Sequence, residues 1–162
     1  METHVTDAVA GELTLTLDRD GGTMRVEGDA IPAIVVRRSA EAVVRRHVPI
    51  GTRDPDRLTM TLDGAPVPLR PGPGRVTRHS YRIEVDRAGN VYTLIPTSEE
   101  SSSLFRGEHH LGNLTTITDG EVRAEWVASP TPEEVAIGYA LATCFGSGAE
   151  HPLSALVGMF TF

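Results

Sequence analysis

The sequence predicts a mainly β protein, an antiparallel β-barrel of roughly ten to twelve strands that encloses a C-terminal hydrophobic helix. Apolar and polar residues alternate with a period of two in several short segments, which is typical of half-buried strands. Turn-forming residues separate these segments, as they do in antiparallel hairpins. Residues 132–145 are apolar on almost every side, and such a helix must be enclosed by protein or lipid. A meander of many strands curls or closes, because closure removes its exposed edges.

The β-rich part is expected to cover residues 10–128. Residues 12–17 alternate most clearly, with leucines on one face and threonines on the other, and residues 58–62 repeat the pattern. Hairpin turns are expected at residues 86–90 and 119–120, where Asp and Gly occur together. Further strands are predicted at residues 23–27, 33–38, 43–48, 81–85, 91–95, 114–117 and 122–127.

Three segments interrupt this pattern. Residues 39–46 fit either a short helix capped by Ser39 or a strand, and the β-branched pair Val43 and Val44 favours the strand. Residues 66–75 contain four prolines, which remove the N–H donors that a central strand needs, so a loop is expected. Residues 97–103 are polar and acidic and predict a second loop.

The helix at 132–145 has clear start and stop signals. Thr131 suits the N-cap, Pro132 suits the first helical position, and Glu134 completes a capping box. Gly146 is a natural C-terminal stop. A helix of this length extends about 21 Å, which fits inside a barrel and is too short to span a bilayer.

The chain of 162 residues is expected to form one domain, residues 1–162. Its C-terminal tail, residues 153–162, is apolar and is expected to form a short helix or a strand. The N-terminal residues show neither a basic region nor an apolar run, so no signal peptide is expected. The single cysteine, Cys144, excludes an intramolecular disulfide. Together these observations predict a cytoplasmic protein.

Charge is distributed unevenly along the chain. The net charge is -7, yet residues 37–87 carry eleven arginines against six acidic residues. These arginines either face water and pair with the acidic flanks, or form an anion-binding face. Nucleic-acid binding is not expected, because the chain is acidic and aromatic residues are sparse in the basic segments.

The best candidates for anion contact lie around residue 78. The predicted ligand-binding residues are Arg75, Arg78, His79 and Arg82, with Arg70 nearby, and a second basic cluster comprises Arg37, Arg38, Arg45 and Arg46. A phosphorylated headgroup or an acidic protein partner would need only a few such charges.

No catalytic, metal or cofactor site is predicted. Glu108, His109 and His110 are adjacent, but neighbouring side chains of a strand point to opposite faces and cannot easily chelate one ion. The sequence contains no phosphate-binding glycine loop and no nucleophile elbow. Cys144 lies in the apolar helix, where burial would suppress thiolate formation.

The order of elements from residue 80 to 146 resembles the tubby C-terminal-like group, which includes scramblase and LURP-one-related proteins. The resemblance is carried by the hairpin turn at 86–90, by residues 103–107 and 111–114, and by the strand pair and capped apolar helix that follow. It implies a β-barrel of about a dozen strands around a central helix. It also implies a non-catalytic binding module, in some relatives for phosphoinositides or membranes.

The sequence therefore predicts a binding or scaffold module for an anionic ligand, either a lipid headgroup or an acidic protein partner. Membrane insertion is not expected, whereas peripheral contact is compatible with the sequence. Two alternatives stay open. One is a small enzyme with a site near His79, Glu108 and His109, and the other is an oligomeric structural protein that associates through residues 153–162.

Overall fold

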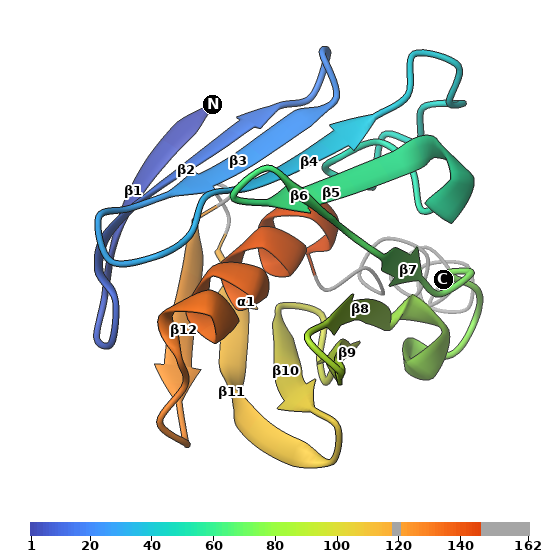
Figure 1. The fold of residues 1–162 in the computed structure, drawn as a ribbon. Coiled ribbons are helices and arrows are strands. Elements are labelled where there is room, and N and C mark those ends of the chain that lie inside the picture. The colour runs from blue at the N-terminus through green and yellow to red at the C-terminus, as the bar shows by residue number, and fades with distance from the viewer. Residues whose placement is uncertain (118–120, 147–162) are drawn as a thin grey trace.

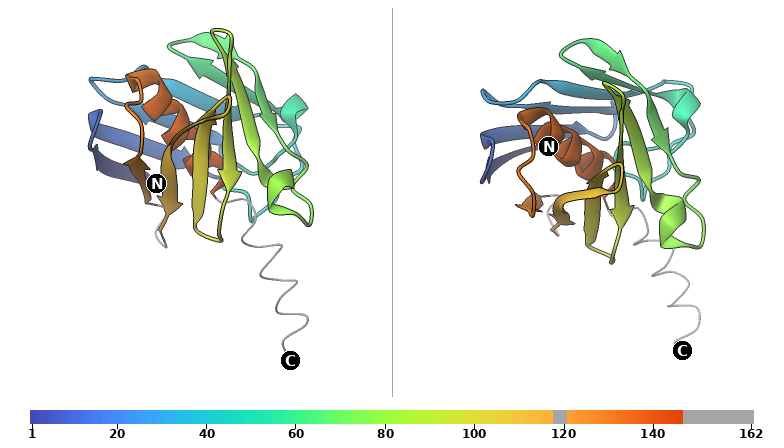
Figure 2. Two further views of the ribbon diagram at one scale, coloured as in Figure 1. Left: turned by 90° about the horizontal axis from the view of Figure 1, so that it is seen from below. Right: turned by 60° about the horizontal axis from the view of Figure 1, so that its bottom comes forward.

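In the described part of the chain, two six-stranded antiparallel sheets enclose one α-helix (Figures 1 and 2). The computed structural model describes residues 1–117 and 121–146. The helix, α1 (Pro132–Phe145), lies between the sheets and packs against strands of both. The predicted fold class, mainly β with a C-terminal helix, is confirmed at this level.

The first sheet follows chain order without a crossover. Its hydrogen-bonded neighbours run from the first strand to the sixth, so every connection is a hairpin or a longer loop between adjacent strands. Its strands are β1 (Glu2–Asp7), β2 (Gly11–Asp18), β3 (Thr23–Glu27), β4 (Ile34–Arg38), β5 (Leu58–Leu62) and β6 (Ala65–Val67). A single 3-10 turn, η1 (Pro55–Arg57), precedes β5.

The second sheet repeats this plan with the remaining strands, again paired in chain order. A second 3-10 turn, η2 (Arg78–Tyr81), lies between its first two strands. The strands are β7 (Leu69–Pro71), β8 (Ile83–Arg87), β9 (Asn90–Pro96), β10 (Ser101–Arg106), β11 (His109–Thr116) and β12 (Val122–Trp126).

The described strands form two sheets, and no strand ladder closes these into the predicted single barrel. Strands β1 and β12 lie side by side at one margin, but no ladder of hydrogen bonds joins them. At the other margin only Pro68 separates β6 from β7. Each of these two strands has three residues and contains a proline, which suits an edge position because proline lacks an N–H donor.

Most predicted strands are confirmed within a few residues, and those at 23–27 and 58–62 have the predicted bounds. The hairpin at 86–90 is also confirmed, because Arg87 pairs with Asn90 across Ala88 and Gly89. Both turn residues have positive φ, as a tight type I′ hairpin requires. Strands β11 and β12 pair as predicted, whereas turn residues 119–120 and the tail at 153–162 lie outside the described residues.

Several local predictions were wrong. Residues 66–75 were expected to form a loop, but residues 66–67 belong to β6 and residues 69–71 form β7. Residues 43–48 form no strand, and residues 39–46 form neither of the two expected elements. Val43 is 83% exposed, so its β-branched side chain has no sheet face to pack on. Residues 101–103 were assigned to a loop but begin β10, where Ser102 and Ser103 are buried. The β-rich part also starts before residue 10, because β1 pairs with β2.

Helix α1 begins and ends where the sequence predicts. Thr131 and Glu134 form the capping box, each accepting a hydrogen bond from the backbone of the other. Every residue from Glu134 to Phe145 is buried, which confirms that the helix is enclosed on all sides. At Gly138 a Cβ would lie 3.1 Å from Leu104 and 3.2 Å from Trp126, so the second sheet approaches the helix closely there. No helix in the described ranges is long and apolar enough to cross a membrane.

Asp7 connects the helix to both sheets. It ends β1 and is almost fully buried. Its Oδ1 accepts hydrogen bonds from Tyr139 on α1 at 2.7 Å and from Trp126 on β12 at 2.8 Å. Its Oδ2 accepts from the backbone N–H groups of Val9 and Ala10, both at 2.9 Å. One carboxylate therefore holds together the margin where no strand ladder joins the sheets.

Glu134 provides a second polar anchor at the start of the helix. Arg106 and Tyr92, both from the second sheet, donate to its Oε2 at 2.7 and 3.1 Å. Burial favours the neutral carboxyl. The bonds from Thr131, Arg106 and Tyr92 outweigh this effect and hold the pKa of Glu134 below its usual value. Burial, together with the adjacent Glu134 charge, raises the pKa of Tyr92 to about 12.

Replacing Tyr139 by Phe should lower the free energy of unfolding by about 2 kcal/mol, because the variant loses a buried hydrogen bond to a carboxylate. Tyr81→Phe is a matched control: Tyr81 is equally buried, but its hydroxyl has no partner among the described residues. Chemical denaturation should show little or no loss for the control. Equal losses in both variants would contradict the role of Asp7.

Glu134→Gln should destabilise the protein by about 2 kcal/mol at neutral pH, because it removes the charge that Arg106 and the helix N-terminus stabilise. The folded-state pKa of Glu134 is depressed. Its contribution is therefore present above the unfolded-state value of about 4.5 and is lost as the pH falls through the folded value. Denaturation between pH 7 and pH 3 should show the two proteins converging below pH 4.5. A constant difference would be inconsistent with this assignment.

Candidate anion-binding surface

The predicted ligand-binding residues lie in the connection between β7 and β8, residues 72–82, here called the basic loop. The loop continues the β7–β8 pairing beyond the strands, since Gly72 N–H donates to Arg82 O at 2.7 Å and Gly74 N–H donates to Ser80 O at 2.9 Å. Ser80 Oγ accepts from Arg75 N–H at 2.8 Å and donates to Thr77 O at 2.6 Å. Hydrogen bonds within the loop therefore fix the conformation of its backbone.

Arg75, Arg78 and His79 point to solvent from this tied backbone. In the described part of the chain the two arginines have neither an ion pair nor a side-chain hydrogen bond. Val76 lies between them and is 67% exposed, so the tip combines two unpaired cations with one apolar side chain. Cations held without acidic partners are available to an external anion.

Arg82 and Arg70, in contrast, are already engaged by carboxylates. Arg82 donates to Glu84 at 3.1 Å and to His79 O at 3.2 Å. Arg70 binds both Asp86 oxygens and also donates to Glu84 at 3.3 Å. The hydrogen bonds to Arg70 hold the pKa of Asp86 below its usual range. Of the four predicted ligand-binding residues, the structure thus leaves Arg75, Arg78 and His79 unpaired and gives Arg82 an internal partner.

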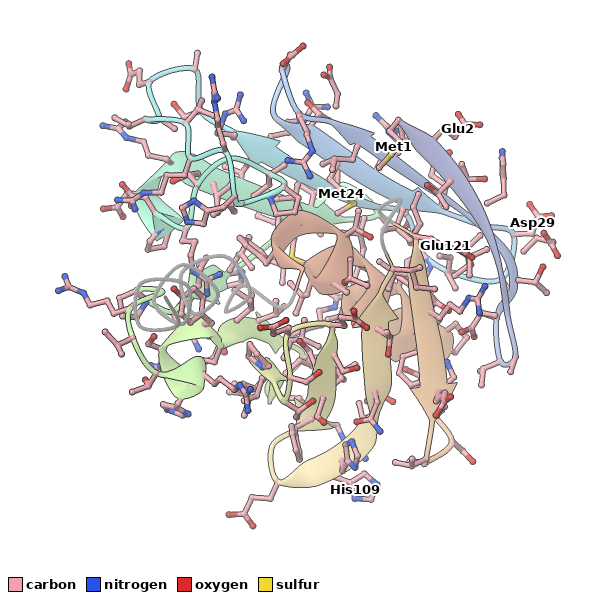
Figure 3. All side chains as sticks on the ribbon, turned by 180° about the vertical axis from the view of Figure 1, so that it is seen from behind. Met1, Glu2, Met24, Asp29, His109 and Glu121 are labelled. Atoms are coloured by element: carbon pink, nitrogen blue, oxygen red, sulfur yellow. The ribbon has the colours of Figure 1, made fainter. Side chains whose placement is uncertain are left out.

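A hollow of about 540 Å³ lies beside the basic loop on the outer face of the second sheet. His79 and Glu108, two of the residues considered for a small enzyme, both line it, together with Arg82 and Glu84. The third residue, His109, does not line the hollow and lies at the tip of the β10–β11 hairpin (Figure 3). No hydrogen bond joins His79 to Glu108 among the described side chains, so these residues do not form an assembled acid–base pair.

The second basic cluster divides into structural and exposed members. Arg38 donates to the backbone oxygens of Ile50, Arg19 and Asp20 at 2.8, 3.1 and 3.1 Å, which ties the loop after β4 to the β2–β3 turn. Arg45 and Arg46 are exposed on that loop. The cluster therefore does not act as one surface.

Cys144 is fully buried, and burial raises the pKa of its thiol well above the usual value, so it is not a reactive nucleophile. Within residues 1–117 and 121–146, no three His, Cys, Asp or Glu side chains are grouped as metal ligands would be.

Arg53 was not singled out from the sequence, yet it packs directly against the basic loop. Its Nε donates to Gly72 O at 3.1 Å, and its side chain is buried. An arginine between Thr52 and Asp54 in a polar segment carries no periodic signal of burial, so only the tertiary structure reveals it.

Comparison of the chain with protein-family models, with curated proteins and with solved structures found no match.

Proposed function

We propose that the protein is a non-catalytic binding module that contacts an anionic ligand through the basic loop. The observation that carries this proposal is the pair of exposed arginines, Arg75 and Arg78, which have no acidic partner in the described structure although the chain as a whole is acidic. A surface charge without an internal partner is free to bind phosphate or carboxylate groups.

An anionic lipid surface is the ligand that this loop fits best. Val76 is exposed between the arginines, and an apolar side chain flanked by cations suits the boundary between headgroups and acyl chains. Each arginine near an anionic surface contributes about 1 kcal/mol. An acidic protein partner would meet the same side chains and is the second ligand class to test.

The proposed relationship to the tubby C-terminal-like group is consistent with this function. Support comes from the twelve described strands and from the enclosed helix, since the resemblance implies about a dozen strands around a central helix. A closed barrel would require backbone pairing between β1 and β12. These two strands already lie side by side, and the hydrogen bond from Trp126 to Asp7 joins them.

The double variant Arg75→Ala/Arg78→Ala should bind vesicles of phosphatidylcholine and phosphatidylserine about 30-fold more weakly than the natural chain, because two surface cations together supply about 2 kcal/mol. Co-sedimentation over a range of lipid concentrations measures this change. The matched control is Arg25→Ala/Arg123→Ala, which removes two exposed arginines from β3 and β12 and gives the same net charge.

Binding of the control should stay within about threefold of the natural chain, and raising the salt should weaken binding of the natural chain. Equal losses in the two double variants would indicate a response to net charge alone. Undiminished binding of Arg75→Ala/Arg78→Ala would refute the role of the basic loop.

A further inference from the structure

Arg53 occupies an unusual position in the interior, where three parts of the chain surround its guanidinium group. The backbone of Gly72 accepts the Nε–H at 3.1 Å. The guanidinium carbon lies 5.0 Å from the centre of the Tyr81 ring and 5.6 Å from that of Phe145, the last residue of α1. The beginning of the basic loop, its end at Tyr81 and the end of α1 therefore surround one cation.

The two terminal nitrogens of this guanidinium lack acceptors. Nη1 and Nη2 of Arg53 are inaccessible to solvent and have no hydrogen-bond partner among the described residues, and the same holds for the Tyr81 hydroxyl. Burial lowers the pKa of Arg53 to about 10, so the group is still charged at neutral pH. Buried polar groups are nearly always hydrogen-bonded, and an orphaned set of donors indicates an acceptor other than the described residues.

The loop around Arg53 is shaped by two glycines. A Cβ at Gly74, where φ is +66°, would lie 2.7 Å from Cδ and Nε of Arg53. A Cβ at Gly72 would lie 2.3 Å from the carbonyl oxygen of Ser80. The Pro-Gly-Pro-Gly segment thus lets bare backbone approach the guanidinium from the side of the loop.

The helix compensates the positive charge of Arg53 but does not satisfy its hydrogen-bond donors. The C-terminal end of α1 carries partial negative charge and has no basic residue in its last turn, so a nearby cation is favourable there. The Tyr81 and Phe145 faces also stabilise a cation. Neither effect provides hydrogen-bond acceptors for the Nη donors.

We propose that Arg53 is the centre of a second, interior site that binds the phosphate group of a small ligand through Nη1, Nη2 and the Tyr81 hydroxyl. The planar guanidinium fork matches two oxygens of one phosphate group. Phosphate is favoured over a carboxylate because Arg75 follows Gly74 directly and Arg78 lies three residues further on, and their positive charge stabilises a dianion in preference to a monoanion.

Access to this site requires movement of the basic loop. The Nη atoms are covered in the structure, and Gly74 of the basic loop lies against the Arg53 side chain. Lifting residues 73–79 breaks the hydrogen bonds that Ser80 makes with Gly74 and Arg75, while Tyr81 stays beside Arg53. The apparent affinity therefore includes the free energy of opening. The proposal of an interior site does not rest on lipid binding by the outer surface of the same loop.

Thermal unfolding in inorganic phosphate tests this site, with sodium chloride at equal ionic strength as the reference. A phosphate concentration ten times Kd should raise the melting temperature of the natural chain by about 3–6 °C. Arg53→Met fills a similar volume without charge or donors and should show no phosphate-dependent shift. Arg75→Ala/Arg78→Ala should retain at least half of the shift, because Arg53 is intact.

A second variant keeps the test decisive if Arg53→Met does not fold. Tyr81→Phe removes only a hydroxyl that has no described partner, so it should fold and bind phosphate about threefold to tenfold more weakly. A phosphorus NMR titration measures both affinities directly. Glycerol 3-phosphate and acetate serve as further ligands. If glycerol 3-phosphate binds at least as tightly as phosphate, the natural ligand is a phosphorylated metabolite or headgroup. If acetate binds more tightly than phosphate, the phosphate assignment is overturned.

Three results would overturn the interior site altogether. They are no phosphate-specific shift in the natural chain, an equal shift in folded Arg53→Met, or unchanged phosphate affinity in Tyr81→Phe. Vesicle binding by Arg53→Met should be unaltered. The two sites are separate if vesicle binding is lost only in Arg75→Ala/Arg78→Ala and phosphate binding is lost only in Arg53→Met. Either proposal can then fail without the other.

Discussion

The rest of the structure depends on the need to enclose a helix that has no polar face. From Glu134 to Phe145 every side chain of α1 is buried, so a single sheet could not cover it. Each sheet presents one apolar face to the helix, and the alternation in strands such as β2 follows from this requirement. The outer faces are left for charged side chains, and the basic loop projects from the end where the helix stops.

Apolar contacts alone would not fix how such a helix is rotated, because the hydrophobic effect has no direction. Two buried carboxylates supply that specificity. At the N-terminal end of the helix, Glu134 accepts hydrogen bonds from Arg106 and Tyr92. Asp7 accepts hydrogen bonds from Tyr139 of the helix and from Trp126 of β12. Each carboxylate has several donors, so burial of its charge is compensated. The polar contacts therefore set the rotation of the helix, and the apolar contacts supply most of the stability.

The elements predicted correctly from the sequence are those whose signal is local. Helix α1 has a capping box and an unbroken apolar run, and β2 and β5 alternate along their length. β1 was missed because only Val5 marks its buried face, and β10 because serines at its start resemble a loop. The exposed arginines of the basic loop were predicted from their clustering. Burial of Arg53 arises from tertiary contacts with Gly72, Tyr81 and Phe145, which no local pattern encodes.

The position of α1 in the chain has a consequence for synthesis in the cell. All twelve strands leave the ribosome before the helix that separates their apolar faces. Until residues 132–145 emerge, the two sheets have no common core and their inner surfaces are open to each other and to other nascent chains. Completion of the fold therefore waits for its last described element, and any pause in translation before this helix prolongs the exposure of the apolar inner faces.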